Sequence, residues 1–155
     1  MGGQKHYNAS GGFSQYLYTH NEGDTIRDGN LEAKVVYKKN TKDYHESLPL
    51  YSNTSSMYFG LKKNPNTGDS NIDQLRLYKD RKAFMDFDWG HEHNVFDQNG
   101  KVIKTYPLGT VHVQFFNIVD GKPRRDLSRV RMMSNAEIKK YGDLLRKADP
   151  TVKFR

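Results

Sequence analysis

The sequence predicts one α+β domain: a twisted antiparallel sheet of about five or six strands with a C-terminal helix packed on it. Several short segments alternate between polar and apolar residues, which is typical of half-buried strands. The pair Asn99-Gly100 favours a hairpin turn, and a capping box ahead of an apolar stripe predicts a helix near the C-terminus. With 155 residues and no cysteine, the chain has the size of one ordinary domain and lacks both disulfides and thiolate metal ligands.

The predicted strands follow a lead-in of different composition. Residues 1–32 are rich in Gly, Asn, Asp and Tyr, and we interpret them as an irregular N-terminal arm. Residues 33–155 are interpreted as the single α+β domain. Within it, β-branched, aromatic or alternating residues predict strands at 33–38, 57–61, 73–78, 83–89 and 110–119. The polar residues 79–82 are expected to connect two of these strands as a hairpin.

Alternation in two of these strands separates a polar face from an apolar one. Asp86 and Asp88 share one face of the strand 83–89, and His112 and Gln114 share one face of the strand 110–119. The opposite faces are apolar and carry Met85, Phe87, Trp89, Val111, Val113 and Phe115.

The chain is predicted to close with a helix. Ser134 and Glu137 have the spacing of a capping box, in which each side chain bonds the other residue's backbone amide. An apolar stripe follows at helical spacing, and Asp149-Pro150 ends it. The stripe consists of Ile138, Tyr141, Leu144 and Leu145.

The formal charge of +7 resides entirely in residues 122–155, which hold 11 Lys and Arg against 4 Asp and Glu. Such a concentration of one sign is typical of proteins with a polyanionic partner: nucleic acid, or an anionic protein or nucleoprotein surface. Arginine forks match phosphates. A solvated basic tail, or arginines paired with carboxylates, is the structural alternative. The candidate nucleic-acid-binding residues are Lys122, Arg124, Arg125, Arg129, Arg131, Lys139 and Lys140.

No apolar run approaches the roughly 18–20 residues that span a bilayer, and no signal-peptide core follows Met1. We therefore expect a cytoplasmic protein without a membrane partner.

The densest group of reactive side chains is Asp86, Asp88, His91 and His93, joined by His112 if its strand pairs alongside. Imidazoles and carboxylates together suit acid–base chemistry near neutral pH. They also suit a divalent metal held by nitrogen and oxygen ligands. No other cofactor is expected. The structural alternative is a turn at residues 88–91 held by Asx-type hydrogen bonds.

These residues resemble a group of small phage and prophage proteins and the C-terminal modules of bacterial polymorphic toxins. The resemblance spans about residues 71–147 and rests on Gln74-x-Arg76-x-Tyr78, on Asp86-x-Asp88-x-x-His91 and on a later strand with His112. In the resembled pattern the last motif is P-H-x-H. Here Gln114 replaces its second histidine, and no proline precedes His112.

The resemblance implies a nuclease-like protein that cleaves RNA or DNA in a host cytoplasm or virion. In this hypothesis His91 and His112 are the acid/base pair, with His93 as a further catalytic candidate. Arg76 and Arg124 neutralise phosphate, and Asp86 and Asp88 orient a histidine or bind metal. The alternative hypothesis, favoured by Gln114, is a non-catalytic phage accessory, either a virion component or an inhibitor that binds a host nucleoprotein.

Overall fold

The computed structural model describes residues 20–40, 46–63 and 70–155. Its elements, in chain order, are β1 (Thr25–Asp28), β2 (Leu31–Tyr37), β3 (Lys39–Asn40), β4 (Glu46–Ser47), β5 (Met57–Lys63), β6 (Ser70–Lys79), β7 (Lys82–Asp88), β8 (His93–Phe96), β9 (Val102–Tyr106), β10 (His112–Val119), β11 (Lys122–Met132) and α1 (Asn135–Ala148).

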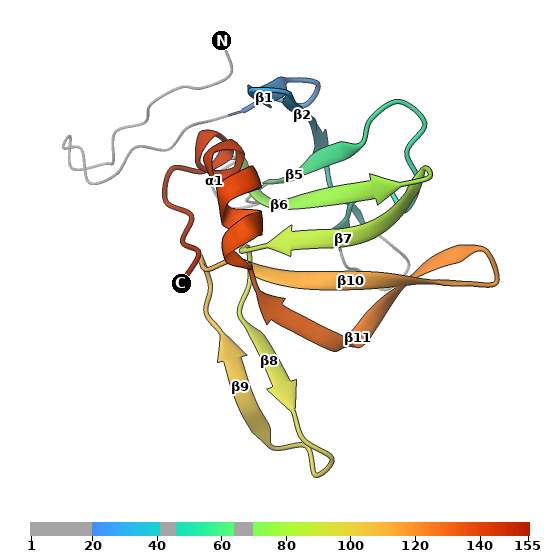
Figure 1. Cartoon of the computed structure of the whole chain (residues 1–155), viewed down its shortest axis with the longest axis vertical. Helices are drawn as coiled ribbons and strands as arrows, with labels where there is room; N and C mark the ends of the chain where they lie inside the picture. Colours follow the sequence, from blue (N-terminus) through green and yellow to red (C-terminus); the bar gives the residue numbers. More distant parts are fainter. Residues whose placement is uncertain (1–19, 41–45, 64–69) are drawn as a thin grey trace.

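Seven of these strands form one mixed sheet in the order β1-β2-β5-β6-β7-β10-β11 (Figure 1). The strands β3 and β4 form a separate two-stranded sheet, as do β8 and β9. The α+β class and the C-terminal helix are confirmed. The predicted strand number and the all-antiparallel pairing are wrong, because the main sheet has seven strands and β2 pairs with β5 in parallel.

Both differences have a physical reason. Strand β11 carries several charged residues and β1 lies among turn-forming residues, so neither has the apolar alternation that indicates a strand. The parallel pair follows from the long connection between Tyr37 and Met57, which lets the chain re-enter the sheet in the same direction. Strand β1 lies inside the range 1–32 that we expected to be irregular. Residues 1–19 of that range lie outside the described residues.

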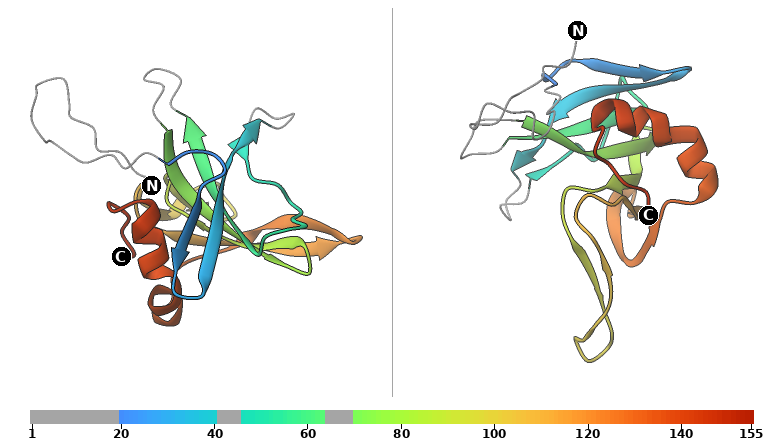
Figure 2. Two further views of the ribbon diagram at one scale, coloured as in Figure 1. Left: turned by 90° about the horizontal axis from the view of Figure 1, so that it is seen from above. Right: turned by 90° about the vertical axis from the view of Figure 1, so that its left-hand side faces the viewer.

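One face of the sheet is apolar and packs against α1, as the views from three sides show (Figures 1 and 2). Of the side chains expected to point there, Phe87, Val111 and Val113 have no exposed surface, whereas Met85 and Phe115 are partly exposed. Leu144 and Leu145 of the helix stripe are buried against them. Trp89, at the end of β7, donates its indole N–H to the carboxylate of Asp149 at 2.9 Å and so ties the sheet to the end of the helix.

The opposite face of the sheet is polar, yet it is also buried. Two rows of side chains cross the central strands β6, β7 and β10. One row is Gln74, Asp88 and His112, and the other is Arg76, Asp86 and Gln114. The sequence alternation predicted the shared face of Asp86 with Asp88 and of His112 with Gln114, and both are confirmed. Segment 48–52 covers part of this face, since Leu48 and Pro49 accept hydrogen bonds from it through their carbonyl oxygens.

The two predicted hairpins are present. Strands β6 and β7 are joined through Asp80 and Arg81, whose φ angles of 51° and 67° match a type I′ turn. Strands β8 and β9 are joined at 97–101, where Asp97 accepts hydrogen bonds from the amides of Asn99 and Lys101. This second hairpin projects away from the main sheet (Figures 1 and 2).

Helix α1 begins at the predicted capping box. The hydroxyl of Ser134 accepts from the amide of Glu137 at 3.1 Å, and the Glu137 carboxylate accepts from the amide of Ser134 at 2.8 Å. The described part of the chain contains no helix with both the length and the apolar character that a membrane crossing requires.

Replacing the cap should weaken the helix without changing the sheet. We expect Ser134→Ala to lower the free energy of unfolding by about 1 kcal/mol, because the amide of Glu137 loses its acceptor. Urea denaturation followed by circular dichroism measures the change. The same substitution at the exposed Ser56 is the control and should leave the midpoint in place. An equal effect at both positions would contradict a capping role.

Candidate functional site

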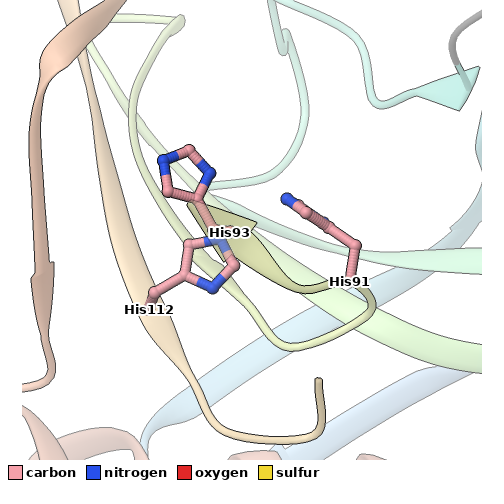
Figure 3. Close-up of side chains that lie close together, drawn as sticks. All are labelled: His91, His93 and His112. Carbon is pink, nitrogen blue, oxygen red and sulfur yellow. The ribbon is translucent and has the colours of Figure 1, made fainter. Parts of the chain in front are cut away.

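Three imidazoles meet at one end of the polar face (Figure 3). His91 lies in the connection after β7, His93 opens β8, and His112 opens β10. One nitrogen from each ring lies within 4.8 Å of the others. The side chain of His91 is 50% exposed, whereas His112 has no exposed surface. The cluster therefore runs from solvent at His91 down to the sheet at His112.

Asp88 orients the outermost histidine. Its carboxylate lies 3.2 Å from Nδ1 of His91 and also accepts from the amide of Gly90. The Asx-type turn considered from the sequence is therefore present, and it holds Asp88 next to His91. Burial raises the pKa of Asp88, but the hydrogen bond and charge of His91 outweigh it and bring the pKa down to about 2. The same hydrogen bond raises the pKa of His91. Because Asp88 contacts Nδ1, the other ring nitrogen of His91, Nε2, is not engaged by this carboxylate.

The two inner histidines are neutral near pH 7. Burial lowers the pKa of His112 to about 4, and burial also lowers the pKa of His93. The side-chain nitrogen of Gln114 lies 3.2 Å from Nε2 of His112 and 3.5 Å from Nδ1 of His93. Among the described residues, Nδ1 of His112 has no hydrogen-bond partner although it is buried. Buried polar atoms without partners are uncommon and require an explanation.

Asp86 belongs to a second group, in the neighbouring row. Its carboxylate accepts from Nε and Nη2 of Arg76 at 2.7 and 2.9 Å, from Gln74 at 2.8 Å and from Arg125 at 2.8 Å. Arg76 also donates to the carbonyl oxygen of Leu48 at 2.7 Å. Asp86 has no exposed surface and Arg76 is 1% exposed.

The six predicted catalytic residues thus separate into two groups. His91, His93, His112 and Asp88 form the cluster, while Asp86 and Arg76 form a buried ion pair next to it. This burial argues against the expected contact of Arg76 with phosphate, because its guanidinium is already engaged inside the protein. No local pattern distinguishes the two groups, since both aspartates lie on the same strand face.

Two further polar residues support the cluster and escaped the sequence reasoning. Nζ of Lys38 lies 2.5 Å from a carboxylate oxygen of Asp73, and both side chains are nearly buried. The Asp73 side chain fills the space beside Gly90, where an added Cβ would lie 2.2 Å from a carboxylate oxygen. Only glycine fits there without a shift, so Gly90 permits the turn that places His91.

The predicted basic surface does not form one continuous patch. Arg125, Arg129 and Arg131 are each paired with a carboxylate, of Asp86, Asp126 and Glu137 respectively. Arg129 and Arg131 project to the same side, and both guanidiniums lie over the ring of Phe115.

The remaining candidate cations are exposed and, within the described residues, have no carboxylate within ion-pair distance. They are Lys122, Arg124, Lys139 and Lys140. The first two lie at the start of β11, next to the β10–β11 turn, and the last two lie on α1. Figure 1 shows the tip of this hairpin and α1 on opposite sides of the molecule.

Comparison of the chain with family models, with curated proteins and with solved structures found no match.

Removing the acceptor at the centre of the second group should strongly destabilise the protein. We expect Asp86→Ala to lower the free energy of unfolding by about 3–5 kcal/mol, because Arg76 is left as an unpaired buried charge. Asp143→Ala is the matched control, since it breaks an exposed Asp–Arg pair and should change stability little. Urea titration of both variants measures the difference. Similar midpoints would refute the central role of Asp86.

Proposed function

We propose that this protein cleaves phosphodiester bonds of RNA or DNA at the histidine cluster. The observation that carries the proposal is the pair of Asp88 and the solvent-facing His91, next to a second accessible imidazole on His93. A buried carboxylate that orients an exposed imidazole is an arrangement typical of general acid–base catalysis.

The accessible histidines are the better candidates for proton transfer. The sequence suggested His91 with His112, but a side chain without exposed surface cannot reach a substrate directly. In the proposed site His93, whose pKa is lowered, removes a proton from the attacking hydroxyl, and His91, whose pKa is raised, protonates the leaving oxygen. Arg125, whose side chain is 31% exposed, supplies a positive charge from the adjacent row for the developing phosphate charge.

The phage or toxin-module assignment draws on the resembled motifs. The side chains of Gln74, Arg76, Asp86 and Asp88 all lie in the two buried rows, and His91 is bonded to Asp88. The motifs therefore correspond to one connected polar layer, which supports treating them as a unit.

A second candidate is a non-catalytic accessory protein that binds nucleic acid or a nucleoprotein. One observation favours it: Gln114 occupies the place of a histidine in the resembled pattern and contacts both inner histidines. An amide cannot transfer protons as an imidazole does.

Loss of the outer imidazole should abolish cleavage. We expect His91→Ala to reduce the rate at least about a hundredfold, because the general acid is gone. Its melting temperature should fall only modestly, because the buried Asp88 loses its His91 partner but keeps the hydrogen bond from the amide of Gly90. Cleavage of mixed-sequence RNA and single- and double-stranded DNA, with and without EDTA, measures the effect. His20→Ala removes a histidine outside the cluster and should stay active.

If the wild-type protein cleaves none of these nucleic acids, the cleavage proposal is refuted and the hypothesis of a non-catalytic accessory protein is favoured.

The unpaired cations on β11 should contribute to binding through phosphates. We expect the double variant Lys122→Ala, Arg124→Ala to bind nucleic acid more weakly, by a similar factor for all sequences. The slope of log affinity against log salt should fall by about one to two phosphate contacts. Fluorescence anisotropy at several salt concentrations measures both. Lys62→Ala, Lys63→Ala removes the same charge elsewhere, and an equal loss there would show that only net charge matters.

A further inference from the structure

We propose that His91, His93 and His112 together bind a divalent transition-metal ion of the Zn²⁺ class. This inference goes beyond the proposed cleavage and does not depend on it, because metal binding can be measured without turnover. It rests on the positions of the three rings, on the partner of the outer ring and on an unpartnered atom of the inner ring.

The rings are close to a metal-binding arrangement. Their candidate ligand nitrogens all lie within 4.8 Å of one another. Nitrogens bound to one tetrahedral zinc at 2.0–2.1 Å lie about 3.4 Å apart. The remaining difference is small enough for rotations of the side chains, since His91 and His93 are partly exposed. Figure 3 shows the nitrogen at the tip of His91 directed toward the other two rings.

The outer ligand already has the partner typical of metal-bound histidines. Asp88 contacts Nδ1 of His91, which leaves Nε2 as the metal-binding atom. A carboxylate bonded to the far nitrogen fixes the tautomer and orientation of a ligating imidazole. Asp88 also places a negative charge beside the site, and it is itself fixed by the amide of Gly90.

The inner ligand offers the second, independent observation. His112 has no exposed surface, and its Nδ1 has no hydrogen-bond partner among the described residues. Its other ring nitrogen faces Gln114. A metal ion bound at Nδ1 would supply the interaction that this buried atom otherwise lacks, whereas a metal ion bound at Nε2 would replace the contact with Gln114.

Three protein nitrogens leave the fourth tetrahedral position for water, which is the pattern of catalytic rather than structural zinc sites. Metal-bound water is acidified enough to act as a nucleophile near neutral pH. In a metal-loaded protein, that water would take over the role assigned to His93 as base, and EDTA in the cleavage assay would reveal this exchange.

The test uses the full chain, treated with EDTA and then freed of it. Isothermal titration with Zn²⁺ should give one ion per chain. Titration with Co²⁺ should give visible absorption bands with the intensity of a tetrahedral site. His93→Ala removes a partly exposed ligand and should weaken Zn²⁺ binding at least about tenfold. Asp88→Asn should weaken it by about 10–100-fold, because the orienting carboxylate is lost.

His20→Ala is the control, a buried histidine outside the cluster, and should bind Zn²⁺ as the wild type does. A thermal melt of each variant without metal confirms that the comparison is between folded proteins. Absence of Co²⁺ bands together with no saturable Zn²⁺ binding would overturn the proposal. Equal affinities of His93→Ala and His20→Ala would overturn it as well, because the binding would then not involve the cluster.

Discussion

Asp86 has no exposed surface and accepts four hydrogen bonds, from two side chains of β6 and one of β11. Through these bonds one carboxylate connects three strands of the main sheet. A buried carboxylate without such partners would cost several kcal/mol, so the strands must meet in this register or the charge stays uncompensated. The registers of β6 with β7 and of β7 with β10 are therefore specified by charge as well as by the apolar face.

The polar layer around this carboxylate is balanced within itself. Three cations match the three aspartates of this layer in number: Lys38 pairs with Asp73, and both Arg76 and the partly exposed Arg125 pair with Asp86. The third aspartate, Asp88, has no Lys or Arg partner among the described residues. Of these aspartates only Asp88 bonds a histidine. The histidine cluster thus lies at the edge of this buried polar layer, where the carboxylate of Asp88 contacts the partly exposed His91. Segment 48–52 covers part of the polar layer, and its carbonyl oxygens accept hydrogen bonds from the side chains of Arg76 and Tyr78.

Local patterns in the sequence were sufficient for part of this arrangement. Alternation around Phe87 and Val113 predicted both faces of the central strands, and the Ser134–Glu137 pair predicted the start of the helix. Alternation cannot tell a buried polar face from a solvated one, which is why Arg76 was expected to meet phosphate. Partner choice depends on distant segments: Arg125 is 39 residues from Asp86, and nothing local distinguishes it from the exposed Arg124. The parallel pairing of β2 with β5 likewise depends on the path of the long connection between them and not on residues within either strand.

Strands β7 and β10 are neighbours in the sheet, yet residues 89–111, including the β8–β9 hairpin, separate them in the chain. Only the base of this excursion, near His93 and Tyr106, contacts the cluster, whereas Phe96, Val102 and Ile103 further along are exposed. The closure entropy of such a loop changes by only about 0.6 kcal/mol for each doubling of its length. The outer part of the hairpin can therefore lengthen, shorten or accept an inserted segment over evolutionary time while the residues at its base keep their positions.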